Sequence, residues 1–350
     1  MHRVFPAEWA PQGAVLLIWP HEGTDWADRL TEAEKAFAAL AAAITRYEPI
    51  VVVCRDRKLR ERALQQLLDI GCSRAAVGTV LVDSDDTWAR DIAPIGVLDD
   101  GLPLVIDWEF NGWGGRYPHK KDGVFGYELI DSAGFATLGY QRAPAVLEGG
   151  AVDTDGAGTL LVNRPTILGP TRNPNLDEAS AEALLQRYLG IDRTLWIDVP
   201  PLAGDDTDGH IDTLARFCGP KTIAHAAPCA SGTDPNAGTL AQLAEQLAEL
   251  RTADGEPYGL IPLPGPEPIA DHDRNPCPAT YANFLIVNGA VLVPSYAEAA
   301  DGPAAERLQE AFPERAILPV PSRTFISESG SLHCLTMQLP DGSFEDLALS

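Results

Sequence analysis

The sequence predicts an α/β protein in which about five ββαβ units follow one another and close into a radial, propeller-like ring. Three features of the 350-residue chain predict this fold. Short apolar segments are joined in pairs by tight turns, each pair is followed by an amphipathic helix and another strand, and no linker or low-complexity run separates the units. A doubly wound sheet needs strictly alternating strands and helices, which the hairpins do not fit. Residues 1–350 are therefore expected to form a single domain.

The first part of the chain contains a strand–helix–strand segment, a second helix with its strand, and a hairpin. The expected elements are a strand at 14–19, a helix at 30–47, a strand at 50–54, a helix at 58–70, and strands at 79–82, 92–98 and 102–108. The helix at 30–47 is Ala-rich with apolar residues at helical spacing, whereas 50–54 is β-branched. Asp99-Asp100-Gly101 provides the hairpin turn. Residues 91–144 are interpreted as a variant unit with a less regular helix.

The same order of elements returns in the rest of the chain. The expected elements are strands at 159–162 and 166–168, a helix at 176–189, strands at 194–199, 210–217 and 221–225, a helix at 237–250, strands at 259–263, 283–287 and 290–294, a helix near 304–312 and a strand at 316–320. Gly190 is suited to end the first of these helices because glycine adopts left-handed backbone readily. Asn288-Gly289 is a typical two-residue hairpin turn.

Composition excludes several classes of partner. The chain has 26 Lys and Arg against 50 Asp and Glu, a net charge of −24, which repels nucleic acids and anionic membrane surfaces. No run approaches the roughly 20 apolar residues of a membrane span, and no secretion signal is visible at the N-terminus. The 6 cysteines are scattered without C-x-x-C or zinc-like spacing, so reduced thiols in the cytoplasm are expected.

Cys334 is the first candidate for chemistry. It lies between a Ser/Gly-rich turn at 327–331 and a short alternating strand, where small neighbours leave room for a substrate. A thiol in that position can act as a nucleophile. The ordinary alternative is a buried cysteine that packs as a small hydrophobe.

An imidazole and several carboxylates occupy similar positions elsewhere. His210 and Asp212 are two residues apart on an expected strand and so share a face, Trp88 and Asp91 follow an acidic loop, and Glu148 precedes Gly149-Gly150. Taken singly, each has a structural explanation: a hydrogen-bonded core histidine, a surface acidic loop with a core tryptophan, or an ordinary acidic turn. In a closed ring these residues would converge near the axis with Cys334. Their carboxylates suit a planar cation such as guanidinium, whose N–H donors pair with carboxylates bidentately.

Five segments carry a resemblance to a known family. They are DDTWARDIAPI (85–95), EGGAVDTDGAGTLL (148–161), GHIDTLARF (209–217), YANFLIVNGAVLVPSY (281–296) and GSLHC (330–334). With them the chain resembles the agmatine deiminase branch of the guanidino-group-modifying superfamily, within the peptidyl-arginine deiminase-like family, from Pro6 to Cys334. The resemblance implies a five-bladed α/β propeller, the pentein fold.

The resemblance also implies the site. Cys334 would be the nucleophile, His210 the general acid/base, and Asp91 and Asp212 the carboxylates that clamp the guanidinium, while Glu148 would orient His210 and share the substrate's N–H groups. The implied reaction converts agmatine and water to N-carbamoylputrescine and ammonia through a covalent thiouronium on Cys334. It needs no metal and no organic cofactor.

Two further residues complete the expected substrate site: Trp88 and Asp206 are expected to line it, with Asp206 near the distal amine of agmatine.

Other functions remain open. These are deimination of peptidyl-arginine or another alkylguanidine, a metal-dependent hydrolase using His210, Asp212 and the loop 271–273, and a non-catalytic propeller scaffold. The partner expected is a small cationic guanidino compound, and a homo-oligomer is compatible with the sequence.

Overall fold

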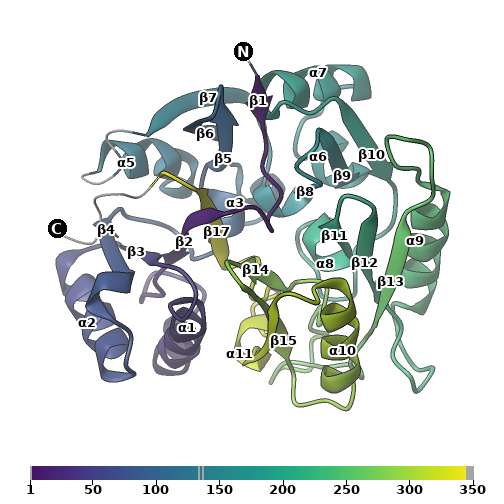
Figure 1. The fold of residues 1–350 in the computed structure, drawn as a ribbon. Helices are drawn as coiled ribbons and strands as arrows, with labels where there is room; N and C mark the ends of the chain where they lie inside the picture. Colours follow the sequence, from purple (N-terminus) through teal and green to yellow (C-terminus); the bar gives the residue numbers. More distant parts are fainter. Residues whose placement is uncertain (1, 133–134, 136–137, 344–350) are drawn as a thin grey trace.

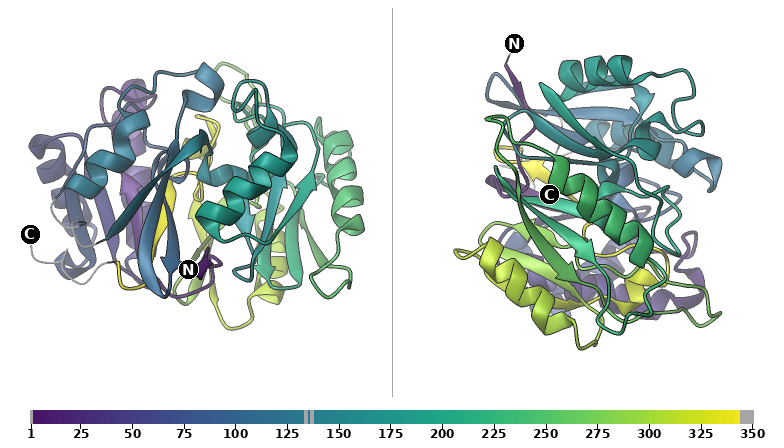
Figure 2. Two further views of the ribbon diagram at one scale, coloured as in Figure 1. Left: turned by 90° about the horizontal axis from the view of Figure 1, so that it is seen from above. Right: turned by 90° about the vertical axis from the view of Figure 1, so that its right-hand side faces the viewer.

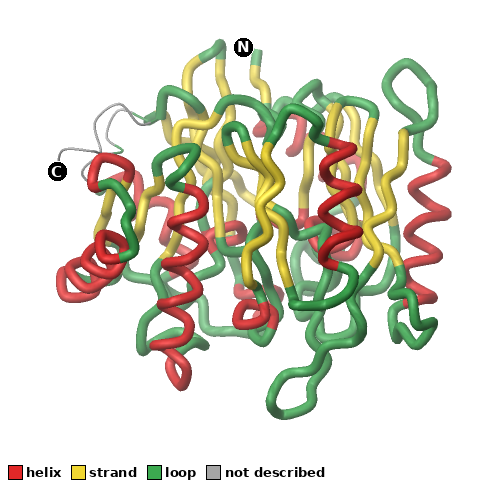
Figure 3. Tube along the Cα trace, turned by 60° about the horizontal axis from the view of Figure 1, so that its bottom comes forward, coloured by secondary structure: helices red, strands yellow, loops and turns green. Residues whose placement is uncertain are grey.

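The computed structural model describes residues 2–132, 135 and 138–343. Within them the strands form five small sheets arranged around a central axis, with the longer helices on the outside of the ring (Figure 1). The two further views in Figure 2 and the tube in Figure 3 show the same outer layer of helices. The predicted α/β propeller of ββαβ repeats is confirmed.

Two consecutive sheets follow the repeat closely. One contains β11 (Ala215–Gly219), β12 (Thr222–Ala227), α9 (Ala237–Glu249) and β13 (Gly259–Pro264), and the next contains β14 (Leu285–Val287), β15 (Ala290–Ser295), α10 (Asp301–Ala311) and β16 (Ala316–Pro321). In both, the first two strands are antiparallel and the third is parallel to the second. A parallel neighbour requires a crossover, and the helix provides it. Gly289 adopts φ of 82° in the predicted hairpin turn.

The preceding sheet contains one wrong prediction. Its elements are β8 (Val152–Thr154), β9 (Thr159–Asn163), α6 (Arg164–Leu168), α7 (Glu178–Leu189) and β10 (Arg193–Ile197). The strand predicted at 166–168 lies in helix α6, because Pro165 favours the first turn of a helix and the Thr166 hydroxyl donates to the Asn163 carbonyl at 2.7 Å. Gly190 ends α7 with φ of 73°, as predicted.

The variant unit has a broken helix, as expected. Its sheet comprises β5 (Ile95–Asp99), β6 (Leu102–Glu109) and β7 (Gly139–Val146), with β1 (Arg3–Val4) along its edge. Between β6 and β7 lie the short helices α4 (Gly112–Gly115), η3 (Asp122–Val124) and α5 (Phe125–Asp131). The irregular segment brings Trp113 and Tyr117 toward the axis, where they line a cavity.

The two ends of the chain close the ring. The last sheet contains β2 (Gln12–Ile18), β3 (Ile50–Cys54), β4 (Val77–Leu81) and the C-terminal strand β17 (Thr336–Pro340), with η1 (Ala27–Arg29), α1 (Leu30–Ile44), α2 (Arg57–Asp69) and η2 (Arg74–Ala76) in its connections. Met337 pairs with Leu16 in the antiparallel β17–β2 ladder. Strand β3 is buried throughout because parallel strands covered by helices have no solvent face. Phe37 of α1 packs edge-on against Trp26 and Phe325, in the core.

A short turn precedes the first strand of each unit. These turns are α3 (Ala89–Ile92), η4 (Gly149–Ala151), α8 (Ile211–Leu214), and the segments 281–283 and 331–335; a further helical turn, α11 (Arg323–Ile326), precedes the last of them. The predicted strands at 92–98 and 210–217 therefore begin too early. The β-branched residues around 211–213 favour a strand, but the Thr213 hydroxyl donates to the His210 carbonyl at 2.8 Å and stabilises a helical turn. Among the described residues, no helix is long and apolar enough to cross a membrane.

Candidate active site

Each unit of the ring contributes a polar side chain from the turn before its first strand. The contributors are Cys334 before β17, Asp91 in α3, Glu148 before η4, His210 and Asp212 at α8, and Asn283 before β14. Because these turns occupy equivalent places in a closed ring, they meet near its axis. All five residues predicted to act in catalysis are buried in this cluster, and Asn283 joins them.

The sulfur of Cys334 is held from two sides. Asn283 donates a hydrogen bond from Nδ2 to Sγ at 3.1 Å, and Oδ2 of Asp212 lies 3.5 Å from Sγ. The main chain of Cys334 is also fixed, since its carbonyl accepts from the Arg90 amide at 3.1 Å. Burial raises the pKa of the thiol well above its usual range, and the carboxylates of Asp212 and Asp91 raise it further. A cation bound beside the sulfur would favour the thiolate.

His210 lies between two carboxylates. Its Nδ1 is 3.6 Å from Oδ1 of Asp91 and its Nε2 is 3.7 Å from Oε2 of Glu148. Neither ring nitrogen makes a hydrogen bond to another described residue, although the side chain is 1% exposed. Burial lowers the pKa of His210, but Asp91 and Glu148 outweigh it and bring the pKa to about 9. The ring is therefore cationic at neutral pH, and both of its N–H groups lack an acceptor within hydrogen-bond distance among the described residues.

An arginine that the sequence analysis missed holds Glu148. The buried Arg172 donates from Nε to Oε1 of Glu148 at 2.6 Å and from Nη1 to Oδ2 of Asp208 at 2.7 Å. Burial raises the pKa of Glu148, but the His210 contact and the Arg172 charge lower it below its usual value. One carboxylate oxygen is thus fixed by arginine, while Oε2, facing His210, accepts no hydrogen bond within the described part of the chain.

Asp91 is fixed by backbone and ring donors. Its Oδ1 accepts from the Gly150 amide and its Oδ2 from the Trp113 indole, both at 2.9 Å. Burial raises the pKa of Asp91, and His210 partly offsets that effect. A Cβ at Gly150 would lie 2.6 Å from Nδ1 of His210 and 2.8 Å from Oδ1 of Asp91, so only glycine fits there. This close approach accounts for the glycine pair that follows Glu148.

Asp212 is arranged differently from the prediction. His210 and Asp212 do not share a strand face: His210 precedes α8 and Asp212 lies within it. The helical turn still directs both side chains to the cluster. Oδ2 of Asp212 lies 2.7 Å from Nδ1 of His333, while Oδ1 accepts no hydrogen bond among the described residues. Burial raises the pKa of Asp212, but the His333 contact lowers it below its usual value.

A cavity opens onto this cluster. Its lining includes Trp88, Asp91, Trp113, Tyr117, Asp206 and Cys334, with Asp25, Asp86 and the segment 327–330 completing the wall. The Tyr117 hydroxyl donates to Oδ2 of Asp206 at 2.7 Å, and burial raises the pKa of Asp206. Trp88 packs so closely on Gly330 that a Cβ there would be 2.2 Å from the ring. The acidic and aromatic lining suits a flat cation with a second positive group.

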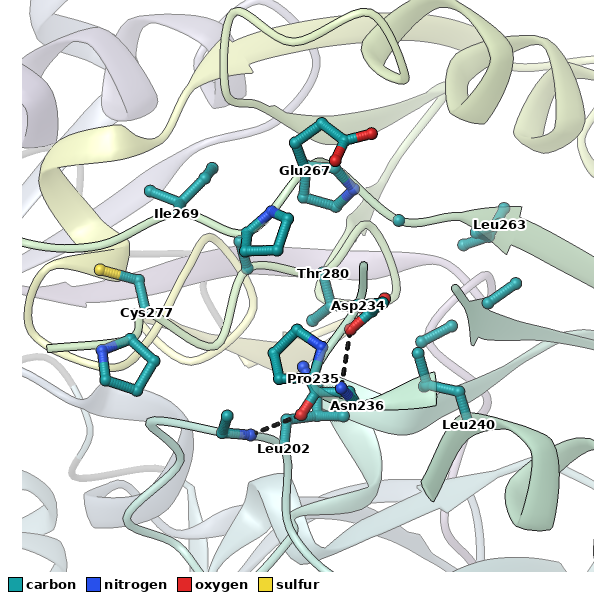
Figure 4. A pocket seen from close by; sticks show the side chains of 18 residues that line it. Leu202, Asp234, Pro235, Asn236, Leu240, Leu263, Glu267, Ile269, Cys277 and Thr280 are labelled. Atoms are coloured by element: carbon teal, nitrogen blue, oxygen red, sulfur yellow. Dashed lines mark hydrogen bonds between the residues drawn. The ribbon is translucent and has the colours of Figure 1, made fainter. Parts of the chain in front are cut away.

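A second cavity has different chemistry (Figure 4). Prolines and aliphatic side chains such as Leu240 and Ile269 line it, and Asp234 accepts from the Asn236 amide at 2.8 Å. None of the residues of the cluster described above lines this cavity. In the loop 271–273, considered as a source of metal ligands, His272 and Asp273 are exposed side chains in contact with each other at 3.4 Å, and neither lines the cavity at the cluster.

The raised pKa of His210 predicts a limit to activity at high pH. If His210 must be protonated to release a leaving amine, kcat/KM should fall above about pH 9. Glu148→Gln removes one of the carboxylates that raise this pKa, so the alkaline limb should move to lower pH. The measurement is kcat/KM for agmatine against pH, with the exposed Glu249→Gln as the control for loss of one surface charge. An alkaline limb that stays in place in Glu148→Gln would contradict the assignment of His210.

Comparison with known proteins identifies the family. The model of the Porphyromonas-type peptidyl-arginine deiminase family matches residues 4–340. The chain belongs to that family. The resemblance inferred from the sequence motifs is confirmed, and the five-sheet ring is the pentein fold.

Three similar proteins illustrate the relationship. The agmatine deiminase of Stutzerimonas stutzeri is 34% identical, over 96% of this chain and 95% of that protein. The crystal structure of a Porphyromonas gingivalis protein, provisionally described as an arginine deiminase, is 42% identical with a TM-score of 0.89 and covers 97% of this chain and 99% of that one. A substrate-bound Cys-to-Ser variant of C. jejuni agmatine deiminase is 29% identical with a TM-score of 0.88 and covers 96% of both chains.

Proposed function

We propose that the protein hydrolyses agmatine to N-carbamoylputrescine and ammonia through a covalent thiouronium on Cys334. One observation carries the proposal: a thiol, an imidazole and three carboxylates from different units of the ring meet next to an acidic cavity. The names of the curated relatives agree with it. The alternative of a non-catalytic scaffold gives no reason for so many buried charges around one sulfur, since burying unpaired charge is costly.

The cluster has the acceptors that a guanidinium requires. Oδ1 of Asp212 and Oε2 of Glu148 are buried and accept no hydrogen bonds within the described residues. A guanidinium presents five N–H donors in one plane, so these two oxygens and the carboxylate of Asp91 can bind its edges while its face stays open. Cys334 would then approach the carbon from the face. Pairing with carboxylates on fixed turns localises charge on the nitrogens and makes the carbon more electrophilic.

The first half-reaction breaks a C–N bond. The thiolate of Cys334 adds to the guanidinium carbon and forms a C–S bond, giving a neutral tetrahedral intermediate whose N–H groups stay paired with the surrounding carboxylates. His210, cationic at neutral pH, gives its proton to the leaving nitrogen. Ammonia departs and an S-alkylthiouronium remains on Cys334. The bound substrate's charge favours the thiolate in spite of the high pKa of the free thiol.

The second half-reaction regenerates the enzyme. His210, now neutral, takes a proton from a water molecule, and the resulting hydroxide adds to the thiouronium carbon. Collapse of this intermediate breaks the C–S bond and returns the electron pair to sulfur, while the hydroxyl group on the carbon loses its proton to solvent. The product is the ureido compound, and the proton taken from water leaves His210 charged for the next turnover. No metal or organic cofactor is required by these steps.

Asp206 should decide the affinity for the distal amine of the substrate. Asp206→Asn keeps the size of the side chain and the Tyr117 contact but removes a charge from the cavity wall. We expect KM for agmatine to rise about 10-fold with kcat nearly unchanged, the loss typical of one charge-assisted contact. Butylguanidine, which lacks the amine, should show no such change. An equal rise in KM for both compounds would mean that Asp206 serves the fold or the guanidinium instead.

Substrate choice tests the proposal directly. Ammonia release should be fastest from agmatine, slower from free arginine, and absent from a blocked arginine peptide, because the acidic wall attracts an amine and repels a carboxylate. The 42% identity to the P. gingivalis protein keeps arginine derivatives as the second candidate. Turnover of the blocked peptide alone would replace agmatine with peptidyl-arginine as the substrate.

We also propose that residues 1–350 act as one catalytic domain in the cytoplasm. Support for a single domain is that all five units of the ring supply a residue to the cluster, so no part of the ring could form it alone. Support for the cytoplasm is that all 6 cysteines are free. The substrate class proposed is a small guanidino cation, and the charge of −24 argues against nucleic acid.

A further inference from the structure

The histidine that precedes Cys334 lies between two carboxylates. Nδ1 of His333 is 2.7 Å from Oδ2 of Asp212, and its Nε2 is 2.9 Å from Oε2 of Glu8, a residue near the N-terminus. All three side chains are buried. A neutral imidazole has one N–H and could donate to only one of these oxygens. Two ionised carboxylates at hydrogen-bond distance on opposite sides therefore call for the doubly protonated, cationic ring.

Both carboxylates are held in the ionised form. Burial raises the pKa of Glu8, but the charges of Arg216 and His333 lower it far below its usual value. Asp212 is shifted in the same direction, mainly by its hydrogen bond to His333. The imidazolium thus has a charged acceptor on each nitrogen, the geometry in which charge-assisted hydrogen bonds are strongest.

The far end of this chain of contacts is anchored in other units. Arg216 of β11 donates to Oε2 of Glu8 and, from Nε, to Oδ1 of Asp153 at 3.1 Å. The other oxygen of Glu8 accepts from the Ile286 amide at 2.6 Å. Glu8 therefore cannot rotate away from His333, and His333 cannot rotate away from Asp212. The contacts run from Arg216 through Glu8 and His333 to Asp212, and positive and negative side chains alternate along them. At the end of this series, the sulfur of Cys334 lies 3.5 Å from Oδ2 of Asp212.

We propose that His333, oriented by Glu8, is a positioning residue that keeps Asp212 ionised and turns one of its oxygens toward the substrate. The inference rests on the proposed function and extends it. Because His333 occupies Oδ2, Asp212 presents Oδ1 as the acceptor for the guanidinium. Oδ2 of Asp212 contacts both Nδ1 of His333 and the sulfur of Cys334, so the positive ring partly neutralises the carboxylate that disfavours the thiolate. His333 itself touches no reacting atom in this arrangement.

Other charged groups face the same chain of contacts and bear on any pH dependence. They are Arg90 of α3, which donates to the His333 carbonyl at 3.3 Å, Asp91 of α3, Asp153 of β8, His210 at α8 and Arg216 of β11. Arg90, His210 and Arg216 favour an ionised Asp212 as His333 does, so loss of His333 should move the titration of Asp212 without abolishing it. Asp91 and Asp153 act in the opposite direction.

The experiment compares His333→Gln and Glu8→Gln with wild type. Both variants keep side-chain size, and the first keeps a donor toward Asp212 but removes the charge. We expect the acid limb of kcat/KM for agmatine to move to higher pH, because Asp212 would then bind a proton more readily, and KM at pH 6 to rise about 10-fold or more while kcat changes less. Glu8→Gln should move the acid limb of kcat/KM in the same direction but by a smaller pH interval. The control is His225→Gln, which removes a buried imidazole from β12, where Nδ1 lies 2.9 Å from the main-chain oxygen of Ala226.

A second measurement needs no turnover. Alkylation of Cys334 by iodoacetamide, followed by peptide mass spectrometry against pH, should be slower in His333→Gln than in wild type at pH 8, because the Asp212 carboxylate beside the sulfur loses its positive partner and opposes the thiolate more strongly. Circular dichroism checks that each variant folds. If His333→Gln does not fold, the pH profile and alkylation rate of Glu8→Gln test the positioning role instead. Folded variants with unchanged pH profiles and alkylation rates would overturn the positioning role. A wild-type protein that releases no ammonia from any guanidine would overturn the proposed function instead, and the alkylation profiles would still decide whether His333 acts on the sulfur.

Discussion

Replacing Cys334 with serine should reduce ammonia release from agmatine by about 10⁴-fold or more. The serine hydroxyl is nearly isosteric with the thiol and can keep the Asn283 and Asp212 contacts, so the fold should persist. The loss comes from ionisation: a hydroxyl is a far weaker acid than a thiol, and the carboxylates around position 334 oppose its ionisation further. Initial rates of ammonia release, with circular dichroism on the same samples, measure the effect.

The control for Cys334→Ser is Cys72→Ser. Cys72 is also buried, but its contact is with the Thr45 hydroxyl at 3.6 Å in another part of the ring. It should retain full activity. Intact mass spectrometry during turnover should detect a substrate adduct on wild-type protein and none on Cys334→Ser. Near-normal turnover by Cys334→Ser would show that the sulfur is not the nucleophile and would remove the basis of the proposed mechanism.

Replacing His210 with glutamine should lower kcat by about 10²–10⁴-fold, the range typical of a lost general acid/base. Glutamine fills the space between Asp91 and Glu148 but can neither protonate the departing nitrogen nor deprotonate water. Because the proposed mechanism uses His210 in both half-reactions, the loss should appear in kcat more than in KM. Steady-state kinetics on agmatine at pH 7 to 9 measure it.

A substrate analogue separates the two roles of His210. In an S-methyl isothiourea analogue of agmatine the leaving group is a thiolate, which departs without a proton from the enzyme. His210→Gln should therefore form the covalent adduct on Cys334 at a rate near that of wild type, but the adduct should persist because no base activates water. Rapid hydrolysis of the adduct by His210→Gln would assign the base to another group, with Asp91 and Glu148, which flank position 210, as the candidates.

The residue types of the site could be predicted from the sequence because they lie in short motifs. Cys334, His210, Asp91, Asp212 and Glu148 each precede a strand that hydrophobic patterning also indicates. Their meeting at one axis followed from the repeat, since equivalent positions of a closed ring face the same centre. The local conformations were less predictable: the β-branched Ile211 and Thr213 suggested a strand, whereas the Thr213 hydroxyl donates to the His210 carbonyl and stabilises a helical turn.

The partners of these residues could not be predicted. Arg172 donates to Glu148, which is 24 residues away in the sequence, and Glu8 contacts His333, which is 325 residues away. No local pattern encodes contacts of that range. Asn283 is the exception, because it lies before the first strand of its unit, as the other site residues do, and the repeat alone could have identified it.

By itself the sequence determined the order of strands and helices and which reactive groups stand at the turns, because periodicity and turn chemistry are properties of neighbouring residues. Only the tertiary structure decided which oxygen of Asp212 is left for a ligand, which side of Glu148 faces His210, and what surrounds the sulfur. The reason is ring closure: β17 pairs with β2, so groups from opposite ends of the chain come within hydrogen-bond distance in a buried space. There, burial and neighbouring charges set each pKa.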